Sequence, residues 1–423
     1  MLELYPHQQD ALKATADKNK VAFYHDMGLG KTYTGAEKMH ELGAKVNLVI
    51  CQKSKIDDWV EHFNKTCFSD YYFYAVDLTT KNGFYDFNVQ LINDLPVVGV
   101  INYELAFRRP ELLKLNDFTL MLDESSLIQN ETAKRSKFIL KLNAKNVILL
   151  SGTPTGGKYE LLWSQLHLLG WNISKKLYWK QYVDTEILDN EGYPITIVKG
   201  YKNVDRLKRK MREYGCHFLK TNDVLNLPEQ INTTITIDTT KEYRKFRKDC
   251  ILEIDDNLLV GDTTLTKMLY ERQLCGHYNE NKLKAFEDLL ESTNDRLIVF
   301  YNFNAELEAL KYLCDSVQRP YSLVNGESKD LYAYENENAS ITLIQYQAGA
   351  MGLNLQKANK IVYFTPTLSS ELFEQSKKRI HRIGQQQPCF YYYLTCKGSV
   401  EEKIYNTLAM RRDYTEALFE GGN

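Results

Sequence analysis

The sequence has little net charge, few glycines and prolines, and no long apolar run. Lys and Arg number 53 against 55 Asp and Glu, a formal net charge of −2, which excludes a protein that coats nucleic acid by overall charge. Gly (22) and Pro (9) are too scarce for a fibrous or linker-rich chain. Apolar runs such as Val97–Ile101 are far shorter than the ~20 residues of a membrane span. The N-terminus lacks a charged region followed by an apolar stretch, so we expect no signal peptide.

Eight cysteines are spread along the chain, and no two have the short spacing that is typical of zinc sites. The two closest are Cys389 and Cys396. This pattern predicts buried, reduced thiols in a soluble protein of the cytoplasm.

Short, uniformly apolar segments alternate with amphipathic segments in two parts of the chain. Such segments are typical of strands buried on both faces of a parallel sheet, and the alternation with helices predicts an α/β fold with two lobes. The length of 423 residues agrees with two to three domains. The predicted strands are Val21–Tyr24, Asn47–Cys51, Val97–Asn102, Thr119–Asp123 and Val147–Ser151 in the first lobe, and Leu297–Tyr301, Ile341–Ile344, Ile361–Thr365 and Phe390–Leu394 in the second.

The chain between these two series has mainly helical and mixed patterns, with one predicted strand at Thr233–Ile237. We therefore place the first lobe at residues 1–170, small helical insertions and a linker at 171–282, and the second lobe at 283–423. Residues 199–220 contain eight Lys and Arg but only two acids. This surplus indicates either a solvated helix face or a surface that contacts phosphates, with Arg206, Lys208, Arg209 and Arg212 as the candidate contacts.

The segment Asp26–Thr32, with the sequence Asp-Met-Gly-Leu-Gly-Lys-Thr, follows a predicted strand and precedes a predicted helix. Its glycines would let backbone N–H groups face a phosphate at the helix N-terminus. Lys31 could reach the β- and γ-phosphates, and the Thr32 hydroxyl could bind Mg²⁺. The strict pattern has a Gly six residues before the Lys, where this chain has His25; the alternative is a glycine-rich turn before a surface helix. The predicted nucleotide-binding residues here are Met27, Gly28, Leu29, Gly30, Lys31 and Thr32.

An acid pair, Asp123 and Glu124, ends the predicted strand Thr119–Asp123. Strand ends of this kind bind nucleotide in doubly wound sheets. Asp123 would hold the hydration shell of Mg²⁺, and Glu124 would orient or deprotonate the attacking water. An isolated acid pair at a strand end is usually only solvated, but a pair that follows a phosphate loop in the same lobe indicates catalysis.

Three further motifs follow along the chain. They are Ser151–Pro154 (Ser-Gly-Thr-Pro), Gly349–Leu355 (Gly-Ala-Met-Gly-Leu-Asn-Leu) and Gln375–Gln385, which ends in His-Arg-Ile-Gly-Gln. With the phosphate loop and the acid pair, this set resembles the motifs of Swi/Snf-type DNA translocases of helicase superfamily two, over nearly the whole chain. The resemblance implies two RecA-like parallel-sheet lobes, ATP and Mg²⁺ as cofactors, and double-stranded or branched DNA as the partner.

The resemblance also implies roles for single residues. Gln8 matches the glutamine that reads adenine, and Ser151–Pro154 matches the segment that links nucleotide state to lobe movement. Arg379 and Arg382 match the arginine fingers; three apart on an expected helix they would share a face, and planar guanidinium groups suit the charge that develops on the γ-phosphate. The loop that senses nucleotide and DNA is matched by Gly352 and Asn354.

The residues that the resemblance places on DNA phosphates are Lys53, Ser54, Asn102, Tyr103 and Gln347. Two departures from the family stand out. Gln345-Tyr-Gln replaces a hydroxyl-bearing segment before Ala348, so this contact would use amides. Ser125-Ser126 stands where many members have a histidine. We see no added chromatin-reading, zinc or tail domain, so the chain resembles the compact members of bacteria and phages.

These features predict a DNA-stimulated ATPase that couples hydrolysis to translocation on double-stranded DNA and so remodels DNA or protein–DNA complexes. Lobe closure would bring the arginines to the γ-phosphate, and backbone contacts would make binding sequence-tolerant and salt-sensitive. Three alternatives stay open: a strand-separating or branch-migration helicase with tyrosines 71, 72 and 74 as a wedge, an ATP-gated clamp that does not travel, and an RNA-directed enzyme.

Overall fold

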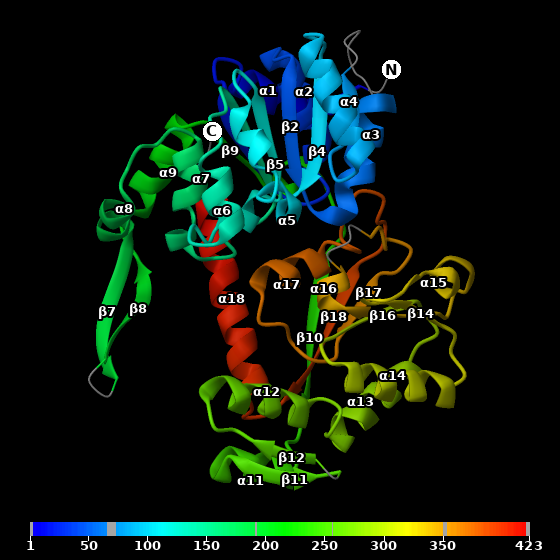
Figure 1. Cartoon of the computed structure of the whole chain (residues 1–423). Helices are drawn as coiled ribbons and strands as arrows, with labels where there is room; N and C mark the ends of the chain where they lie inside the picture. The colour runs from blue at the N-terminus through cyan, green and yellow to red at the C-terminus, as the bar shows by residue number, and fades with distance from the viewer. Residues whose placement is uncertain (1–2, 66–72, 191–192, 256, 350–352, 420–423) are drawn as a thin grey trace. The chain divides into compact units, whose positions relative to one another are not determined.

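The computed structural model describes residues 3–65, 73–190, 193–255, 257–349 and 353–419. The chain forms two compact units (Figure 1): unit 1 comprises Met1–Val224 with Asp413–Asn423, and unit 2 comprises Leu225–Arg412. Each unit is built around one seven-stranded sheet. Within the described ranges, every helix is too short or too polar to cross a membrane.

The sheet of unit 1 is parallel throughout. The five strands predicted for the first lobe are all present, because each is uniformly apolar and buried on both faces. Since the strands are parallel, their carboxyl ends meet at one edge of the sheet. The strand order is β3 (Tyr74–Asp77), β4 (Val97–Asn102), β2 (Val46–Cys51), β5 (Thr119–Asp123), β6 (Asn146–Ser151), β1 (Lys20–His25) and β9 (Cys216–Leu219).

Helices cover both faces of this sheet, because alternate strand residues point to opposite sides. Val21 and Phe23 of β1 belong to one cluster with Met39 and Trp59, whereas Tyr24 belongs to the other cluster. The first cluster includes α1 (Pro6–Ala14), α2 (Lys31–Leu42) and α3 (Ile56–Lys65); the second includes α4 (Lys81–Ile92), α5 (Tyr103–Ala106), α6 (Lys134–Ile139), α7 (Trp163–Leu168), α8 (Lys175–Tyr182) and α9 (Val204–Glu213). The short helix α10 (Thr221–Val224) follows β9.

The sheet of unit 2 is also parallel, except that its last pair is antiparallel. All four strands predicted for the second lobe are present, and one continuous core surrounds them. The order is β10 (Gln230–Ile237), β18 (Cys389–Cys396), β17 (Lys360–Tyr363), β13 (Leu297–Tyr301), β16 (Ile341–Gln345), β14 (Tyr321–Val324) and β15 (Lys329–Asp330). Two parallel sheets with helices on their faces confirm the predicted α/β fold of two RecA-like lobes.

The helices of unit 2 lie mainly between its parallel strands in the sequence. They are α11 (Lys241–Asp249), α12 (Thr264–Cys275), α13 (Glu280–Glu291), α14 (Asn304–Ser316), α15 (Tyr332–Asn336), α16 (Tyr346–Gly349), α17 (Ser370–Lys377) and α18 (Val400–Phe419). The first part of α18 packs into the core of unit 2 through Ile404 and Leu408. Its last residues belong to unit 1, where Tyr414 contacts Tyr201 and Phe419 contacts Phe218.

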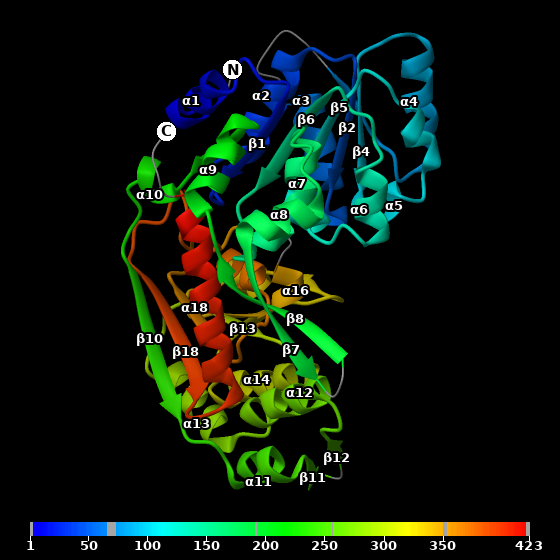
Figure 2. The ribbon, with the colours of Figure 1, turned by 90° about the vertical axis from the view of Figure 1, so that its left-hand side faces the viewer.

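Residues 171–282 were predicted to be mainly helical with one strand, and the described part of this range contains six strands. The predicted strand is part of β10, and β9 completes the sheet of unit 1. The other four form two antiparallel hairpins, β7 (Val183–Asn190) with β8 (Tyr193–Tyr201), and β11 (Ile251–Ile254) with β12 (Asn257–Val260). Figure 2 shows the first hairpin leaving the end of α8. Both hairpins expose aliphatic side chains, so the apolar runs that mark buried strands are missing. The limits placed at residues 170 and 282 stay predictions.

Candidate nucleotide site and nucleic-acid surface

The phosphate loop, Asp26–Thr32, joins the end of β1 to the start of α2, in the context that its sequence predicts. Gly28 and Gly30 have positive φ angles of 85° and 71°, which glycine adopts without strain. A second constraint also favours glycine at position 30, because a Cβ there would lie 2.4 Å from Nε2 of Gln8. The Lys31 ammonium donates to the carbonyl oxygens of His25 (2.9 Å) and Asp26 (3.2 Å). The loop therefore has a defined conformation in which its own carbonyls hold the lysine.

Gln8 lies buried at the start of α1 and contacts this loop. Its Nε2 donates to the Gly30 carbonyl (3.0 Å), and its Oε1 accepts from the Tyr5 backbone N–H (2.8 Å). The neighbouring His7 ring contacts the Leu29 carbonyl (3.1 Å). Gln8 thus fixes the phosphate loop, and its proposed reading of adenine stays a prediction.

The chain at the start of the phosphate loop is hydrogen-bonded to the edge strand β9 and to the start of α10, contacts that the sequence did not predict. His25 Nε2 and His217 Nδ1 are 2.9 Å apart and form a buried hydrogen bond. Asp26 Oδ2 accepts from both the backbone N–H and the hydroxyl of Thr221, each at 3.0 Å. Burial lowers the pKa of His25, and the nearby His217 and Lys31 lower it further, so its ring stays neutral. His25, which takes the place of the expected glycine, is an anchor of the loop.

The acid pair at the end of β5 is held by two aromatic residues. Trp59 of α3 donates its indole N–H to Asp123 Oδ2 (2.9 Å), and the Tyr103 hydroxyl donates to the Asp123 carbonyl (2.8 Å). Burial raises the pKa of Asp123, although the Trp59 bond and the charge of Lys31 act in the opposite direction. Tyr103, which was predicted to contact DNA, is instead fully buried, and its hydroxyl serves to position the acid pair.

Glu124 has a left-handed backbone conformation with a φ angle of 54°. For a residue other than glycine this costs about 1 kcal/mol or more, and such strain is concentrated at functional sites. The conformation turns the chain sharply between β5 and the 3₁₀ helix Ser125–Ile128.

The Ser151–Pro154 segment begins at the end of β6 and packs against the phosphate loop. A Cβ on Gly152 would lie 3.1 Å from Met27 Cγ and 3.4 Å from Lys31 Nζ. A larger residue here would therefore press on the Met27 side chain, so the two segments are in close contact. Unit 1 brings the phosphate loop, the acid pair and this segment together at the carboxyl edge of one sheet.

Arg379 and Arg382 do not lie on a helix, which corrects the prediction that a shared helical face aligns them. Helix α17 ends at Lys377, and both arginines follow it in turns. Tertiary hydrogen bonds compete with the helix here, because the His381 ring contacts the Pro228 carbonyl (2.9 Å) and the Tyr391 hydroxyl donates to the Lys377 carbonyl (3.2 Å).

The two arginines nevertheless contact one segment. Arg379 Nη1 donates to the Leu353 carbonyl (3.4 Å), and Arg382 Nη1 donates to Asn354 Oδ1. Asn354 thus lies beside one of the two candidate fingers, whereas Gly352 lies outside the described residues. Burial lowers the pKa of Arg382.

The remaining DNA candidates differ in exposure. Lys53 and Ser54 are exposed after β2, and Gln347 is exposed on α16. Asn102 is largely buried and donates to Glu104 (3.0 Å). Helix α9 is amphipathic: it buries Leu207 and Met211, and it exposes Arg206 and Arg209. The four candidate DNA contacts in α9 are Arg206, Lys208, Arg209 and Arg212. Of the proposed wedge, Tyr74 is exposed at the start of β3, and tyrosines 71 and 72 lie outside the described residues.

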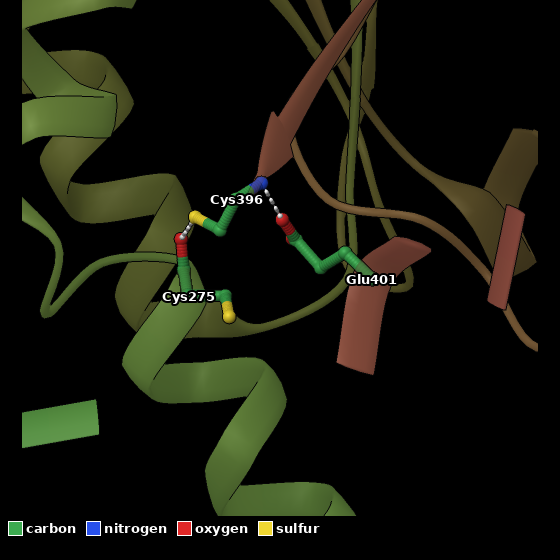
Figure 3. Close-up of side chains that lie close together, drawn as sticks. All are labelled: Cys275, Cys396 and Glu401. Atoms are coloured by element: carbon green, nitrogen blue, oxygen red, sulfur yellow. Dashed lines mark hydrogen bonds between the residues drawn. The ribbon is translucent and has the colours of Figure 1, made fainter. Parts of the chain in front are cut away.

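Cys275, Cys396 and Glu401 lie close enough to share an ion (Figure 3), with ligand atoms within 4.8 Å of one another. Their charge is already balanced, because the buried Lys282 ammonium contacts both carboxylate oxygens of Glu401 (2.6 and 2.8 Å). Burial and the bond to Cys396 raise the pKa of the Cys275 thiol, so it keeps its proton. A cation would have to displace Lys282, and the cluster therefore acts as a polar part of the core of unit 2.

In comparison with known proteins, both parts of the chain match family models. Residues 7–280 match the family model described as SNF2-related domain, and residues 281–384 match the helicase conserved C-terminal domain. The SWI/SNF-related matrix-associated actin-dependent regulator of chromatin subfamily A member 1 of Mus musculus is 22% identical over 90% of this chain and 39% of its own length. The ISWI chromatin-remodeling complex ATPase ISW1 of Saccharomyces cerevisiae is 24% identical over 95% of this chain and 39% of its own.

Among solved structures, the Sulfolobus solfataricus SWI2/SNF2 ATPase core in complex with dsDNA aligns over 99% of this chain and 94% of that chain, with a TM-score of 0.46 and 19% identity. The chain spans about two fifths of the length of the two curated relatives.

Proposed function

Because the chain belongs to the SNF2-related family and carries a helicase conserved C-terminal domain, we propose that it is a DNA-stimulated ATPase that translocates on double-stranded DNA and remodels DNA or protein–DNA complexes. The observation that carries this proposal is the assembly of the phosphate loop, the acid pair and Ser151–Pro154 at one sheet edge of unit 1. This edge is where a doubly wound fold binds nucleotide.

In this proposal unit 1 binds ATP. Lys31 and the loop N–H groups hold the phosphates, and Glu124 orients or deprotonates the attacking water. Thr32 and Asp123 offer a hydroxyl and a carboxylate oxygen, a donor set that suits Mg²⁺; the ion would neutralise charge on the β- and γ-phosphates. Gln8 would add a contact to the base.

We assign Arg379 and Arg382 of unit 2 to the charge that develops on the γ-phosphate during hydrolysis. Hydrolysis then requires residues from both units, and nucleotide state can control lobe movement. Asn354 and Gly352 belong to the segment that would follow this change. We place the protein in the cytoplasm, which agrees with free thiols at the seven cysteines that the structure describes.

For DNA we propose phosphate contacts from Lys53, Ser54, Asn102 and Gln347, and from the outward face of α9. The double substitution R206E/R209E should weaken duplex binding about tenfold and reduce the slope of log affinity against log salt by about 2, since each phosphate contact contributes about 0.9. An unchanged slope would mean that α9 is an ordinary solvated face. The control is Lys114→Glu, which reverses an exposed charge outside the proposed surface.

The main test is the rate of phosphate release from ATP with single-stranded, duplex, forked and four-way DNA and with RNA. We expect duplex DNA to raise turnover most. No rise with any DNA would contradict the proposal, and a rise with RNA alone would favour the RNA-directed alternative. Displacement of a triplex strand without unwinding of a forked duplex would separate translocation from a strand-separating helicase.

A further inference from the structure

Gln165 of α7 uses one fully buried amide to join three segments of unit 1. Its Oε1 accepts hydrogen bonds from the Ser125 hydroxyl (2.8 Å) and the Tyr24 hydroxyl (3.0 Å). Its Nε2 donates to the Pro154 carbonyl (2.8 Å). The side chain is 0% exposed, so water does not compete for these bonds. We call this arrangement the Gln165 bridge.

Each bridged segment continues directly into the candidate nucleotide site. Tyr24 lies two residues before the phosphate loop, and Ser125 follows Glu124. Pro154 ends the segment whose Gly152 packs against Met27 and Lys31. The bridge thus joins the segments at the ends of the three strands β1, β5 and β6.

Sliding any one segment would break at least one bridge bond in a place where no water can replace it. A buried group left without its partner costs about 1–3 kcal/mol, and hydrogen bonds in a connected buried network strengthen one another. Burial also raises the pKa of the Tyr24 hydroxyl well above its ordinary value, so this group remains a donor at any physiological pH. The bridge therefore favours joint movement of the three segments over separate movement.

We propose that Gln165 is a positioning residue that transmits a change at Glu124 to Ser151–Pro154, by making the phosphate-loop strand, the acid turn and this segment move as one body. The inference deepens the proposed function and rests on it for its link to DNA, but the bridge itself concerns nucleotide binding within unit 1.

The substitution Gln165→Met tests this inference, with Gln129→Met as the matched control. Gln129 donates to the same Pro154 carbonyl (3.2 Å) but lies outside the bridge to Ser125 and Tyr24. We expect Gln165→Met to lower DNA-stimulated turnover about tenfold, which corresponds to about 1.4 kcal/mol of lost coupling free energy. The KM for ATP should change less than about threefold. Gln129→Met should change turnover less than about twofold. Equal effects of the two variants would overturn the proposal.

Hydrogen exchange supplies a readout that a purely structural role would not change. In the unaltered protein we expect a non-hydrolysable ATP analogue to protect the amides of both 124–128 and 151–157. In Gln165→Met the first set should still gain protection and the second should not; joint protection in the variant would overturn the inference. Because this measurement needs no DNA, it separates failure of the bridge from failure of the proposed function. Should Gln165→Met not fold, Ser125→Ala with Tyr24→Phe removes both donors and leaves Gln165 in place.

Discussion

The two units hold their candidate nucleotide residues in different ways. In unit 1 the site residues are fixed by bonds from several elements: Trp59 of α3 and Tyr103 of α5 hold Asp123, Gln8 of α1 holds Gly30, and β9 anchors the root of the loop. In unit 2 the two arginines lie in turns and contact one neighbouring segment, Leu353–Asn354. The candidate residues of unit 1 are therefore fixed at the end of its sheet, whereas those of unit 2 lie in turns that follow a helix.

This difference indicates that the two units have different roles in the proposed reaction. In the proposed function, unit 1 would bind nucleotide with little change beyond release of Lys31 from the loop carbonyls. Groups that are already oriented in this way stabilise a developing charge effectively, because they need not reorganise during the reaction. In the same proposal the arginines of unit 2 would change their position with nucleotide state through movement of unit 2 as a whole. If the comparison is correct, substitutions in unit 2 should affect turnover far more than nucleotide binding.

The largest expected effect is that of removing an arginine of unit 2. Arg382→Ala and Arg379→Ala should each lower kcat about 10³-fold, because an arginine finger contributes about 10³–10⁵ to turnover, while ATP still binds to unit 1. Turnover and the Kd of a fluorescent ATP analogue provide the measurement. Arg244→Ala, which removes an exposed arginine of α11, is the charge-matched control. Retention of more than a tenth of the turnover would show that unit 1 does not need this arginine.

The next effect concerns the acid pair of unit 1. Glu124→Gln should lower hydrolysis about 10²–10³-fold, since a positioned general base contributes about 10²–10⁴, and should leave ATP binding intact. The amide keeps the size of the side chain and the left-handed backbone. Single-turnover hydrolysis and nucleotide affinity distinguish the two steps, with Glu61→Gln on the exposed face of α3 as the control. A matching loss of affinity would mean that Glu124 supports binding rather than chemistry.

The sequence predicted some features of the two units and missed others. Strands such as β4 and β13 were predictable because apolar runs are local signals of burial on both faces. The positions of the phosphate loop and the acid pair at strand ends were predictable, because these segments are short local motifs. The anchor between His25 and His217 was not, because 192 residues separate its members, and the Trp59 bond to Asp123 spans 64. No periodicity in the sequence signals such pairs.

The misplaced helix at Arg379 and Arg382 has a related cause. The spacing of apolar and basic residues favours a continuing helix, but the His381 ring bonds to the Pro228 carbonyl before β10. Long-range bonds here outweigh local propensity, which is only a weak prior. The position of a candidate residue could be predicted where it belongs to a short motif, and its partners could not be predicted where they are distant in the sequence.

Each unit also has a carboxyl group whose pKa is raised, the half-buried Asp123 in unit 1 and the fully buried Glu306 in unit 2. Burial raises the pKa of Glu306 to about 7, although it accepts bonds from the backbone N–H groups of Asn302 and Phe303. Because this pKa lies above its ordinary value, the stabilising contribution is complete below about pH 4.5 and is lost as the pH rises through 7. Unit 2 should therefore lose up to about 3 kcal/mol of unfolding free energy between pH 4.5 and 8.

Glu306→Gln should remove this loss and make unit 2 more stable at pH 8. All four tryptophans lie in unit 1, so their fluorescence reports the unfolding of unit 1 and serves as an internal control, while exchange of amides in β13 and β16 follows unit 2. We expect the substitution to flatten the pH dependence of unit 2 alone. A steeper dependence in the variant, or a change confined to unit 1, would contradict the assignment to Glu306.

The smallest effect tests how closely unit 1 is preorganised. Trp59→Phe keeps an aromatic ring in the core but removes the N–H that orients Asp123, and loss of a residue that orients a metal ligand typically costs about 10–100-fold in metal affinity. We expect about a tenfold rise in the Mg²⁺ concentration that gives half-maximal ATPase activity, with near-normal kcat at saturating Mg²⁺. Trp179→Phe is the matched control, since this indole N–H is buried without a partner among the described residues. Equal Mg²⁺ requirements in the two variants would mean that Asp123 is oriented by its strand alone, and the case for a preorganised unit 1 would then rest on the bonds of the phosphate loop.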